Sequence, residues 1–180
     1  MLLPSQEIHA RARNVRLLVL DVDGVLTDGT VAIDSQGHES KRFFIRDGAA
    51  LVWAQKLGLE IAWLSGRPSD VTVRRGHELR IKHVIQDGPD KLAGYDRLMS
   101  MVGLPDAAVA YMGDDLLDLP VLCRVGLSAA PADAAEMVKE RVHWVSIAPG
   151  GHGAVREVVE LLLRASDRWN AVLDLHRAAR

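Results

Sequence analysis

The stretch that decides the fold is Leu17-Leu18-Val19-Leu20-Asp21-Val22-Asp23-Gly24-Val25-Leu26-Thr27-Asp28-Gly29. Its first four residues form a short apolar run, which is typical of a buried strand. Two carboxylates, Asp21 and Asp23, follow at once. In an extended chain, side chains two residues apart point to the same face, so these two carboxylates would repel each other. A hard cation that prefers oxygen ligands, such as Mg²⁺, would relieve that repulsion.

Around this stretch, apolar segments of strand length alternate with segments of helical period. We expect strands over residues 15–20, 59–64, 83–85, 108–112, 126–129 and 142–146. Segments 48–57 and 90–102 have helical spacing, and each is followed by a glycine that can end a helix. The alternation predicts an α/β fold, a Rossmann-like parallel sheet with helices on both faces. In such a sheet, ligands bind beyond the carboxyl ends of the strands.

One segment interrupts the alternation. Residues 30–33 and 41–45 flank the turn-rich Asp34-Ser35-Gln36-Gly37, which predicts a small β-hairpin inserted after the first strand, over about residues 28–45. A two-stranded hairpin is marginally stable by itself. We therefore expect Phe43 and Phe44 to pack on the body or on a partner subunit, unless the hairpin is a surface decoration.

Length and composition limit the possible classes of protein. The 180 residues predict a single domain over 1–180, and 48% apolar with 26% charged residues predicts a globular one. The net charge of -2 argues against a nucleic-acid partner. The single cysteine, Cys123, excludes an intrachain disulfide and is expected in the core. No apolar run approaches the ~18 residues of a membrane span, and no secretory h-region is present, so the expected location is cytoplasmic.

Polar residues follow several of the predicted strands. They are Ser65-Gly66-Arg67, Lys91 at a helix start, Gly113-Asp114-Asp115 and Asp118. Alone, each motif is commonly a turn, a helix cap or a solvated side chain. Together they supply carboxylates for a cation and a lysine, a hydroxyl and backbone N–H groups for an anion, which suits phosphoryl transfer. One carboxylate could attack phosphorus, and the other could protonate the leaving oxygen and then activate water.

The order of DVDGVLTDG, SGR, Lys91 and GDDLLD resembles the haloacid dehalogenase superfamily of aspartate-nucleophile phosphatases. The resemblance implies that Asp21 is the nucleophile and a metal ligand. It implies that Asp23 is the general acid/base and that its main-chain carbonyl is also a ligand. The remaining implied roles are phosphate binding by Ser65 and Lys91, completion of the Mg²⁺ site by Asp114, and support by Asp118.

The spacing of these motifs bears on how substrate is enclosed. In the superfamily, caps that close over substrate are inserted after the first motif or between the second and third. Here a hairpin and one helix fill the first interval, and one helix and a short strand fill the second. We therefore expect no cap domain. The site would be open to water, which phosphoryl transfer disfavours, unless another subunit covers it.

A finer resemblance is to a capless branch, the 3-deoxy-D-manno-octulosonate 8-phosphate phosphatases of lipopolysaccharide sugar biosynthesis. It rests on residues 21–29, Arg46-Asp47-Gly48, the SGR and GDDLLD motifs, and residues 150–158. It implies a homotetramer in which the C-terminal tail, about residues 167–180, reaches a neighbour's site. It also implies substrate contacts from Asp23, Phe44, Ile45, Arg46, Asp47, Gly48, Ser65, Gly66, Arg67, Arg75 and Lys91. The glycine-rich stretch 150–153 could present N–H groups to an anion or form a helix-entry turn.

Phe44, Val52 and Asp87-Gly88 depart from the pattern of that branch. They leave open a related nine-carbon sugar-acid phosphatase or a promiscuous sugar phosphatase. From another class, a receiver-like regulator that binds a phosphoryl group also uses a parallel sheet, acids, a hydroxyl and a lysine. Its first strand would end in adjacent acids, whereas this one ends in Asp-x-Asp. A pseudo-enzyme scaffold is the third alternative.

Overall fold

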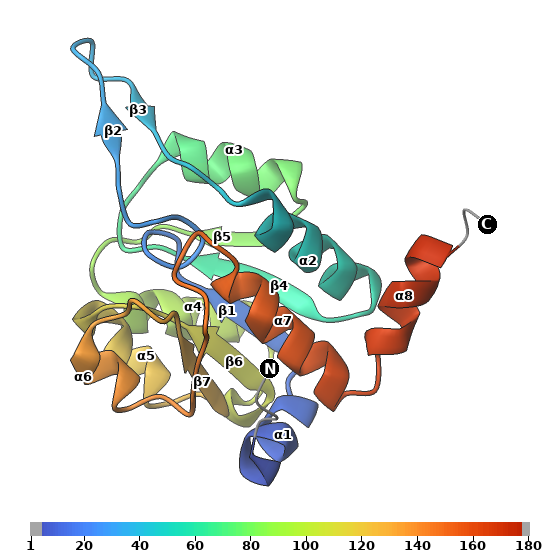
Figure 1. The fold of residues 1–180 in the computed structure, drawn as a ribbon. Helices are drawn as coiled ribbons and strands as arrows, with labels where there is room; N and C mark the ends of the chain where they lie inside the picture. Colours follow the sequence, from blue (N-terminus) through green and yellow to red (C-terminus); the bar gives the residue numbers. More distant parts are fainter. Residues whose placement is uncertain (1–4, 178–180) are drawn as a thin grey trace.

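The computed structural model describes residues 5–177, and a six-stranded parallel sheet lies at its centre (Figure 1). The strand order is β5-β4-β1-β6-β7-β8. In chain order these strands are β1 Leu17–Leu20, β4 Glu60–Leu64, β5 His83–Ile85, β6 Val109–Met112, β7 Leu127–Ala130 and β8 Trp144–Val145. The six strands predicted for the parallel sheet are all present within about two residues of their expected ends, which is the usual precision of strand boundaries. The predicted α/β class is confirmed.

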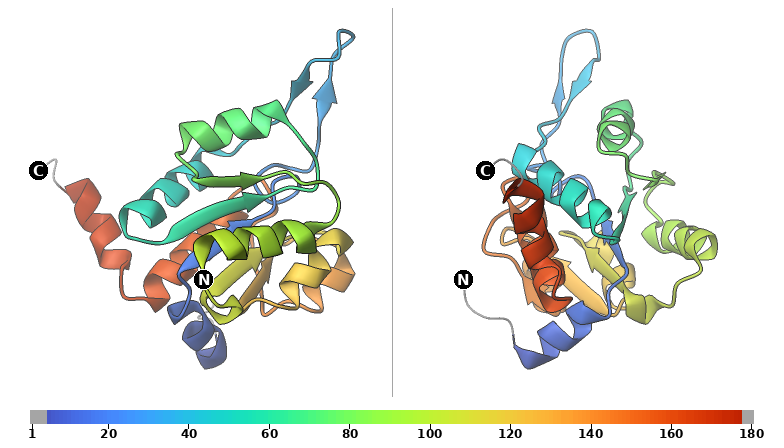
Figure 2. Two further views of the ribbon diagram at one scale, coloured as in Figure 1. Left: turned by 180° about the vertical axis from the view of Figure 1, so that it is seen from behind. Right: turned by 90° about the vertical axis from the view of Figure 1, so that its right-hand side faces the viewer.

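Helices cover both faces of the sheet, because successive side chains of a strand point to opposite faces. Leu18 and Leu20 of β1 face one core, and Leu17 and Val19 face another. The first core includes α1 (Gln6–Arg13), α2 (Ile45–Lys56), α7 (Ala154–Ala165) and α8 (Trp169–Arg177). The second includes α4 (Lys91–Val102), α5 (Leu119–Leu122) and α6 (Glu136–Lys139). Figure 2 shows these layers from two further sides.

The predicted helix over 90–102 has the ends that its sequence indicates. The Asp90 side chain accepts a hydrogen bond from Ala93 N at 3.1 Å and caps α4. Gly103 ends the helix with φ +66°, in the left-handed region that favours glycine. The short helices η1 (Asp106–Ala108) and η2 (Leu116–Asp118) and the helix α3 (Asp70–Glu78) complete the chain.

The predicted hairpin is present and projects from the body (Figure 1). Its strands are β2 (Ala32–Ile33) and β3 (Glu39–Ser40). The prediction of a second strand over 41–45 is wrong, because Lys41 turns inward to pair with Asp23 and Ile45 already begins α2. Phe43 packs on the body, where its ring lies 6.2 Å from that of Trp63.

The exposure of Cys123 and the partial burial of the C-terminal helix α8 bear on two further predictions. Cys123 is exposed, so its predicted core position is wrong: it stands at the end of α5, where Val121 and Leu122 take the buried positions. In the tail, α8 buries Val172 but leaves Leu173 exposed. Residues 178–180 of the predicted tail lie outside the described residues. Within residues 5–177, no helix has the length and apolarity that a membrane span requires.

The strand order determines where a ligand can bind. From β1 the chain continues to β4 on one side of the sheet and later to β6 on the other. In parallel α/β sheets, such a reversal opens a crevice at the carboxyl ends of the strands. Asp21, Ser65 and Gly113 are the first residues after β1, β4 and β6, so the motifs converge at this crevice.

Candidate active site

The carboxyl edge of β1, β4 and β6 carries a cavity of about 340 Å³. Its lining contains the residues that the sequence predicted as catalytic or metal-binding. They are Asp21, Asp23, Ser65, Lys91 and Asp114, joined by Gly29, Gly66, Arg67, Asp115, Leu117 and Asp118. Segments separated by almost a hundred residues therefore meet in one site, as the parallel-sheet prediction required.

Asp21 is buried at the end of β1. Its Oδ2 lies 2.7 Å from Lys91 Nζ, and its Oδ1 accepts a hydrogen bond from Val22 N at 2.7 Å. Burial raises the pKa of Asp21, the nearby charge of Asp118 raises it further, and Lys91 offsets part of the rise. The carboxylate is thus oriented, but its ionised form needs more positive charge than Lys91 alone supplies.

Lys91 is the first residue of α4, where the helix dipole disfavours a cation. The structure shows why it is there: its side chain is only 4% exposed and lies between Asp21 and Asp118, 2.5 Å from the latter. Burial lowers the pKa of Lys91, but the two carboxylates outweigh that effect and the net shift is upward. Lys91 is therefore a permanent buried cation, and the solvated-lysine alternative is wrong.

Asp118 is completely buried and uses both of its oxygens. Oδ1 accepts from Tyr111 Oη at 2.5 Å as well as from Lys91, and Oδ2 accepts from the backbone N–H groups of Asp114 and Asp115. It therefore holds both the lysine and the loop after β6. Tyr111 was missed at the sequence level, although a tyrosine inside an apolar strand is a sign of a buried hydroxyl that needs a partner.

Asp114 is the acid with unused bonding capacity. Its Oδ1 is buried and has no hydrogen-bond partner within residues 5–177. Burial raises the pKa of Asp114, and the charges of Asp21 and Asp118 add to the rise. Gly24, with φ +90°, packs so tightly on this carboxylate that a Cβ would overlap it. The glycine of the first motif thus allows Asp114 to approach Asp21.

This donor set fits a divalent cation. Carboxylate oxygens of Asp21, Asp114 and Asp118 lie within 4.8 Å of one another. Because Asp118 is occupied by four donors, Asp21 and Asp114 are the carboxylates that remain for a metal. Hard oxygen ligands of this kind suit Mg²⁺. The role of the Asp23 carbonyl as a further ligand stays a prediction.

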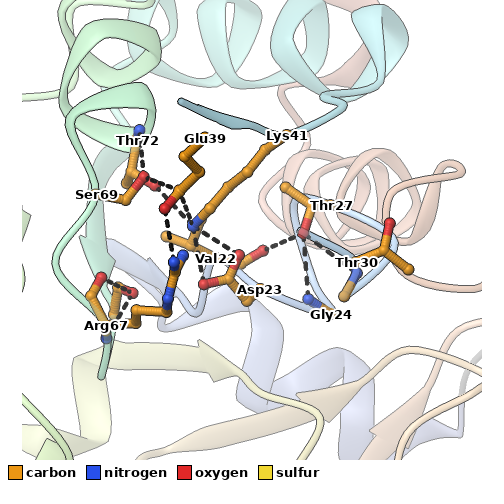
Figure 3. Close-up of polar contacts among 12 residues, drawn as sticks. Val22, Asp23, Gly24, Thr27, Thr30, Glu39, Lys41, Arg67, Ser69 and Thr72 are labelled. Atoms are coloured by element: carbon orange, nitrogen blue, oxygen red, sulfur yellow. Dashed lines mark hydrogen bonds and ion pairs between the residues drawn. The ribbon is translucent and has the colours of Figure 1, made fainter. Parts of the chain in front are cut away.

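Asp23 is held by a residue that the sequence analysis missed. Lys41 Nζ, which comes from the hairpin side, lies 2.8 Å from Asp23 Oδ1 and 2.9 Å from Oδ2 (Figure 3). The miss followed from placing 41–45 in a strand. The available signal was the Glu39-x-Lys41 spacing, which puts two opposite charges on the same side of an extended segment.

Ser65 and Arg67 form the opposite wall of the cavity. Ser65 Oγ accepts from Arg67 N at 3.2 Å and donates to Arg67 O at 3.0 Å, which closes a tight turn after β4. Arg67 Nη2 donates to Glu39 Oε2 at 2.6 Å. Its Nη1 is buried and has no partner in the described part of the chain. One edge of this guanidinium therefore remains available to an anion.

The other predicted substrate residues lie away from this cavity within the single chain. Phe44 and Arg46 line a separate hollow of about 440 Å³ with His152 and Arg156. Arg75 pairs with Glu78 at 2.7 Å and lies against the buried Gly48, while Ile45 is exposed. The sugar contacts of Phe44, Ile45, Arg46, Asp47, Gly48 and Arg75 stay predictions.

Asp47 has an evident structural role. It is buried, and its carboxylate accepts from Gly153 N at 3.2 Å and Arg156 N at 2.8 Å, at the start of α7. Burial raises its pKa to about 6, and the two N–H donors limit the rise. The N–H groups of Gly150 and Gly151 are also taken, by Asp133 Oδ1 and Val25 O. Of the two readings of stretch 150–153, the geometry favours a helix-entry turn.

Asp47→Ala is expected to lower the free energy of unfolding by about 1–3 kcal/mol, because two half-buried N–H groups at the start of α7 lose their acceptor. Thermal and denaturant unfolding measure this. Asp96→Ala is the matched control, since Asp96 is exposed and, within residues 5–177, forms an ion pair only with the surface residue Arg124; its change should stay within about 1 kcal/mol. Equal effects of the two variants would contradict the capping role.

Comparison with known proteins places this site in a family. Residues 62–156 match the model of haloacid dehalogenase-like hydrolases. The chain is 40% identical over 171 residues to the 3-deoxy-D-manno-octulosonate 8-phosphate phosphatase of Yersinia pestis, covering 95% of this chain and 91% of that protein. Identity to the Escherichia coli K12 phosphatase of the same name is 42% over 164 residues, covering 91% and 87%.

A solved structure agrees with the sequence relatives. The 3-deoxy-D-manno-octulosonate 8-phosphate phosphatase from Moraxella catarrhalis, in complex with magnesium ion, phosphate ion and KDO, superposes on this chain with a TM-score of 0.93 at 35% identity. The match covers 96% of this chain and 99% of that one. Both the sequence and the fold agree over nearly the whole length, so the chain belongs to the haloacid dehalogenase-like hydrolases.

Proposed function

We propose that the protein is a Mg²⁺-dependent phosphatase that releases phosphate from 3-deoxy-D-manno-octulosonate 8-phosphate through a phospho-aspartate intermediate. The observation that carries the proposal is the oriented Asp21 carboxylate, held by Lys91 beside the unpartnered Asp114 oxygen. The substrate comes from the relatives named above, which are similar over nearly the whole chain.

The positions of the side chains support the following course for the proposed reaction. Asp21 attacks phosphorus, and the bond between phosphorus and the leaving oxygen breaks. Asp23 gives its proton to that oxygen, then takes a proton from the water that hydrolyses the phospho-aspartate. Lys91, Ser65 and backbone N–H groups of the turn after β4 stabilise the phosphoryl oxygens. A Mg²⁺ held by Asp21 and Asp114 would neutralise phosphate charge.

A sugar acid also carries a carboxylate, which calls for a further cation. The free edge of Arg67 supports this, since it lies on the wall of the same cavity. A panel of phosphate esters tests the substrate: the eight-carbon sugar-acid phosphate, a nine-carbon sugar-acid phosphate, ordinary sugar phosphates and an aryl phosphate. The highest kcat/KM is expected for the eight-carbon compound. A higher value for the nine-carbon compound, or equal values for all, would replace the proposed substrate.

We also propose that a neighbouring subunit of a homotetramer covers the site, because residues 5–177 contain no cap domain. The C-terminal helix α8 offers an amphipathic segment with exposed Leu173 and Leu175. A complex of this kind would exclude water from the phosphate.

Removing residues 168–180 should lower kcat/KM for the sugar-acid phosphate by about 10-fold or more, and lower it less for an aryl phosphate, because only the larger substrate would lose contacts to a neighbour's tail. Steady-state kinetics of the truncated chain, with its mass measured by light scattering, gives the comparison. An equal loss with both substrates would refute the role of the tail.

A further inference from the structure

The hairpin that follows the first motif ends in two charged residues that contact Asp23 and Arg67 of the active-site cavity. Glu39 and Lys41 are two residues apart, so they point to the same side of an extended segment. Figure 3 shows both side chains approaching Asp23 and Arg67 from the hairpin side. The rest of the hairpin is short and exposed, with Ile33 at 65% exposure. These two residues therefore connect the hairpin to Asp23 and Arg67.

Lys41 is buried as a cation. The exposed fraction of its side chain is 0%, against 25% for its partner Asp23. A buried ammonium without partners costs several kcal/mol, and Lys41 has three: both oxygens of Asp23, Thr72 Oγ1 at 3.3 Å and Glu39 Oε1 at 3.7 Å. Its position is thus tightly determined, and it determines the position of the Asp23 carboxylate in turn.

Glu39 links this contact to the wall of the cavity. Its Oε2 accepts from Arg67 Nη2 at 2.6 Å, and its Oε1 accepts from Ser69 Oγ at 2.7 Å at the start of α3. The network runs from the residue assigned to the leaving oxygen, through the hairpin, to the arginine with a free edge. No other cation pairs with Asp23 among the ion pairs of the described chain.

We propose that Lys41 is a positioning residue for proton transfer: it clamps the carboxyl group of Asp23 toward the leaving oxygen. This inference rests on the proposed function. An aspartate that donates a proton must lie within hydrogen-bond reach of the accepting oxygen, and a free carboxyl group would rotate about its side-chain bonds. Lys41 removes that freedom and makes the catalytic geometry depend on the seating of the hairpin.

The test compares leaving groups. The p-nitrophenolate leaving group departs without being protonated, whereas the alkoxide leaving group of a sugar phosphate needs a proton from an acid. Lys41→Met keeps most of the apolar stem and removes the charge. It should lower kcat/KM, which reports only the steps through formation of the phospho-aspartate, about 10²-fold for the alkyl phosphate that the wild type hydrolyses best, and less than about 10-fold for p-nitrophenyl phosphate. A role limited to folding would lower both by the same factor.

The matched control is Lys139→Met, which should leave both rates unchanged, because in the described part of the chain Lys139 of α6 pairs only with the exposed Glu136. If Lys41→Met does not fold, Lys41→Gln, which is uncharged but keeps an NH₂ donor group, takes its place in the same comparison. Equal losses for the two leaving groups, or no loss, would overturn the inference while leaving the proposed function intact. A wild-type protein that hydrolyses no phosphate ester would overturn both.

Discussion

Asp21→Asn is expected to lower phosphate release by about 10⁴-fold or more, because the amide cannot serve as the nucleophile that forms the phospho-enzyme. The fold should survive, since Lys91 keeps its second partner, Asp118. Removing one of several crowded buried acids also relieves repulsion, so the melting temperature should not fall. Phosphate release under saturating substrate and Mg²⁺, together with thermal unfolding, gives both results.

Asp96→Asn provides the matched control for this experiment, because it makes the same chemical change at an exposed position outside the cavity. It should retain full activity. An Asp21→Asn protein with more than a few per cent of the wild-type rate would remove Asp21 from the role of nucleophile, whatever its stability.

Removal of divalent metal should abolish phosphate release, and added Mg²⁺ should restore it. The physical reason is the pair of acids, Asp21 and Asp114, whose pKa values are raised by burial and by neighbouring like charge. A cation bound between them would favour the ionised forms that both need. Phosphate release from chelator-treated protein, before and after Mg²⁺ is returned, measures this.

Binding can also be followed without activity. At about 100 times its dissociation constant, a ligand stabilises the native state by about 2.7 kcal/mol, which corresponds to a rise in melting temperature of about 5–10 °C for a chain of this size. Asp114→Asn should lose most of this rise, whereas Asp96→Asn should keep it. Turnover without metal, or the same rise in both variants, would contradict a site built on Asp114.

The local sequence pattern was sufficient to predict the parallel sheet and the motifs that follow its strands. Each strand is a short apolar run with a turn after it, and in a parallel sheet the ends of such runs meet at one edge. That is why the sequence alone predicts that Asp21, Lys91 and Asp114 meet, as they do in the cavity. The helix over 90–102 was equally readable, because its ends carry an aspartate cap and a left-handed glycine.

Prediction failed where long-range contacts outweigh local pattern. Segment 41–45 has the composition of a strand, but pairing of Lys41 with Asp23 and the early start of α2 take it out of the hairpin ladder. Cys123 lies in an apolar stretch, yet the packing of α5 puts its neighbours inside instead.

The amino-acid sequence by itself determined the α/β class, the absence of room for a cap between the motifs, and the acids, lysine and hydroxyl that phosphoryl transfer uses. The class follows from periodicity and the set of polar residues from their places after the strands, whereas the missing cap follows from motif spacing together with the resemblance to the superfamily. Only the tertiary structure decided that Lys41 holds Asp23 and that Asp47 caps α7. It also decided that both oxygens of Asp118 accept hydrogen bonds, whereas Asp114 Oδ1 has no partner within residues 5–177. Such pairings join residues far apart in the chain, and their partners are chosen by burial and charge in the folded molecule, which no local pattern encodes.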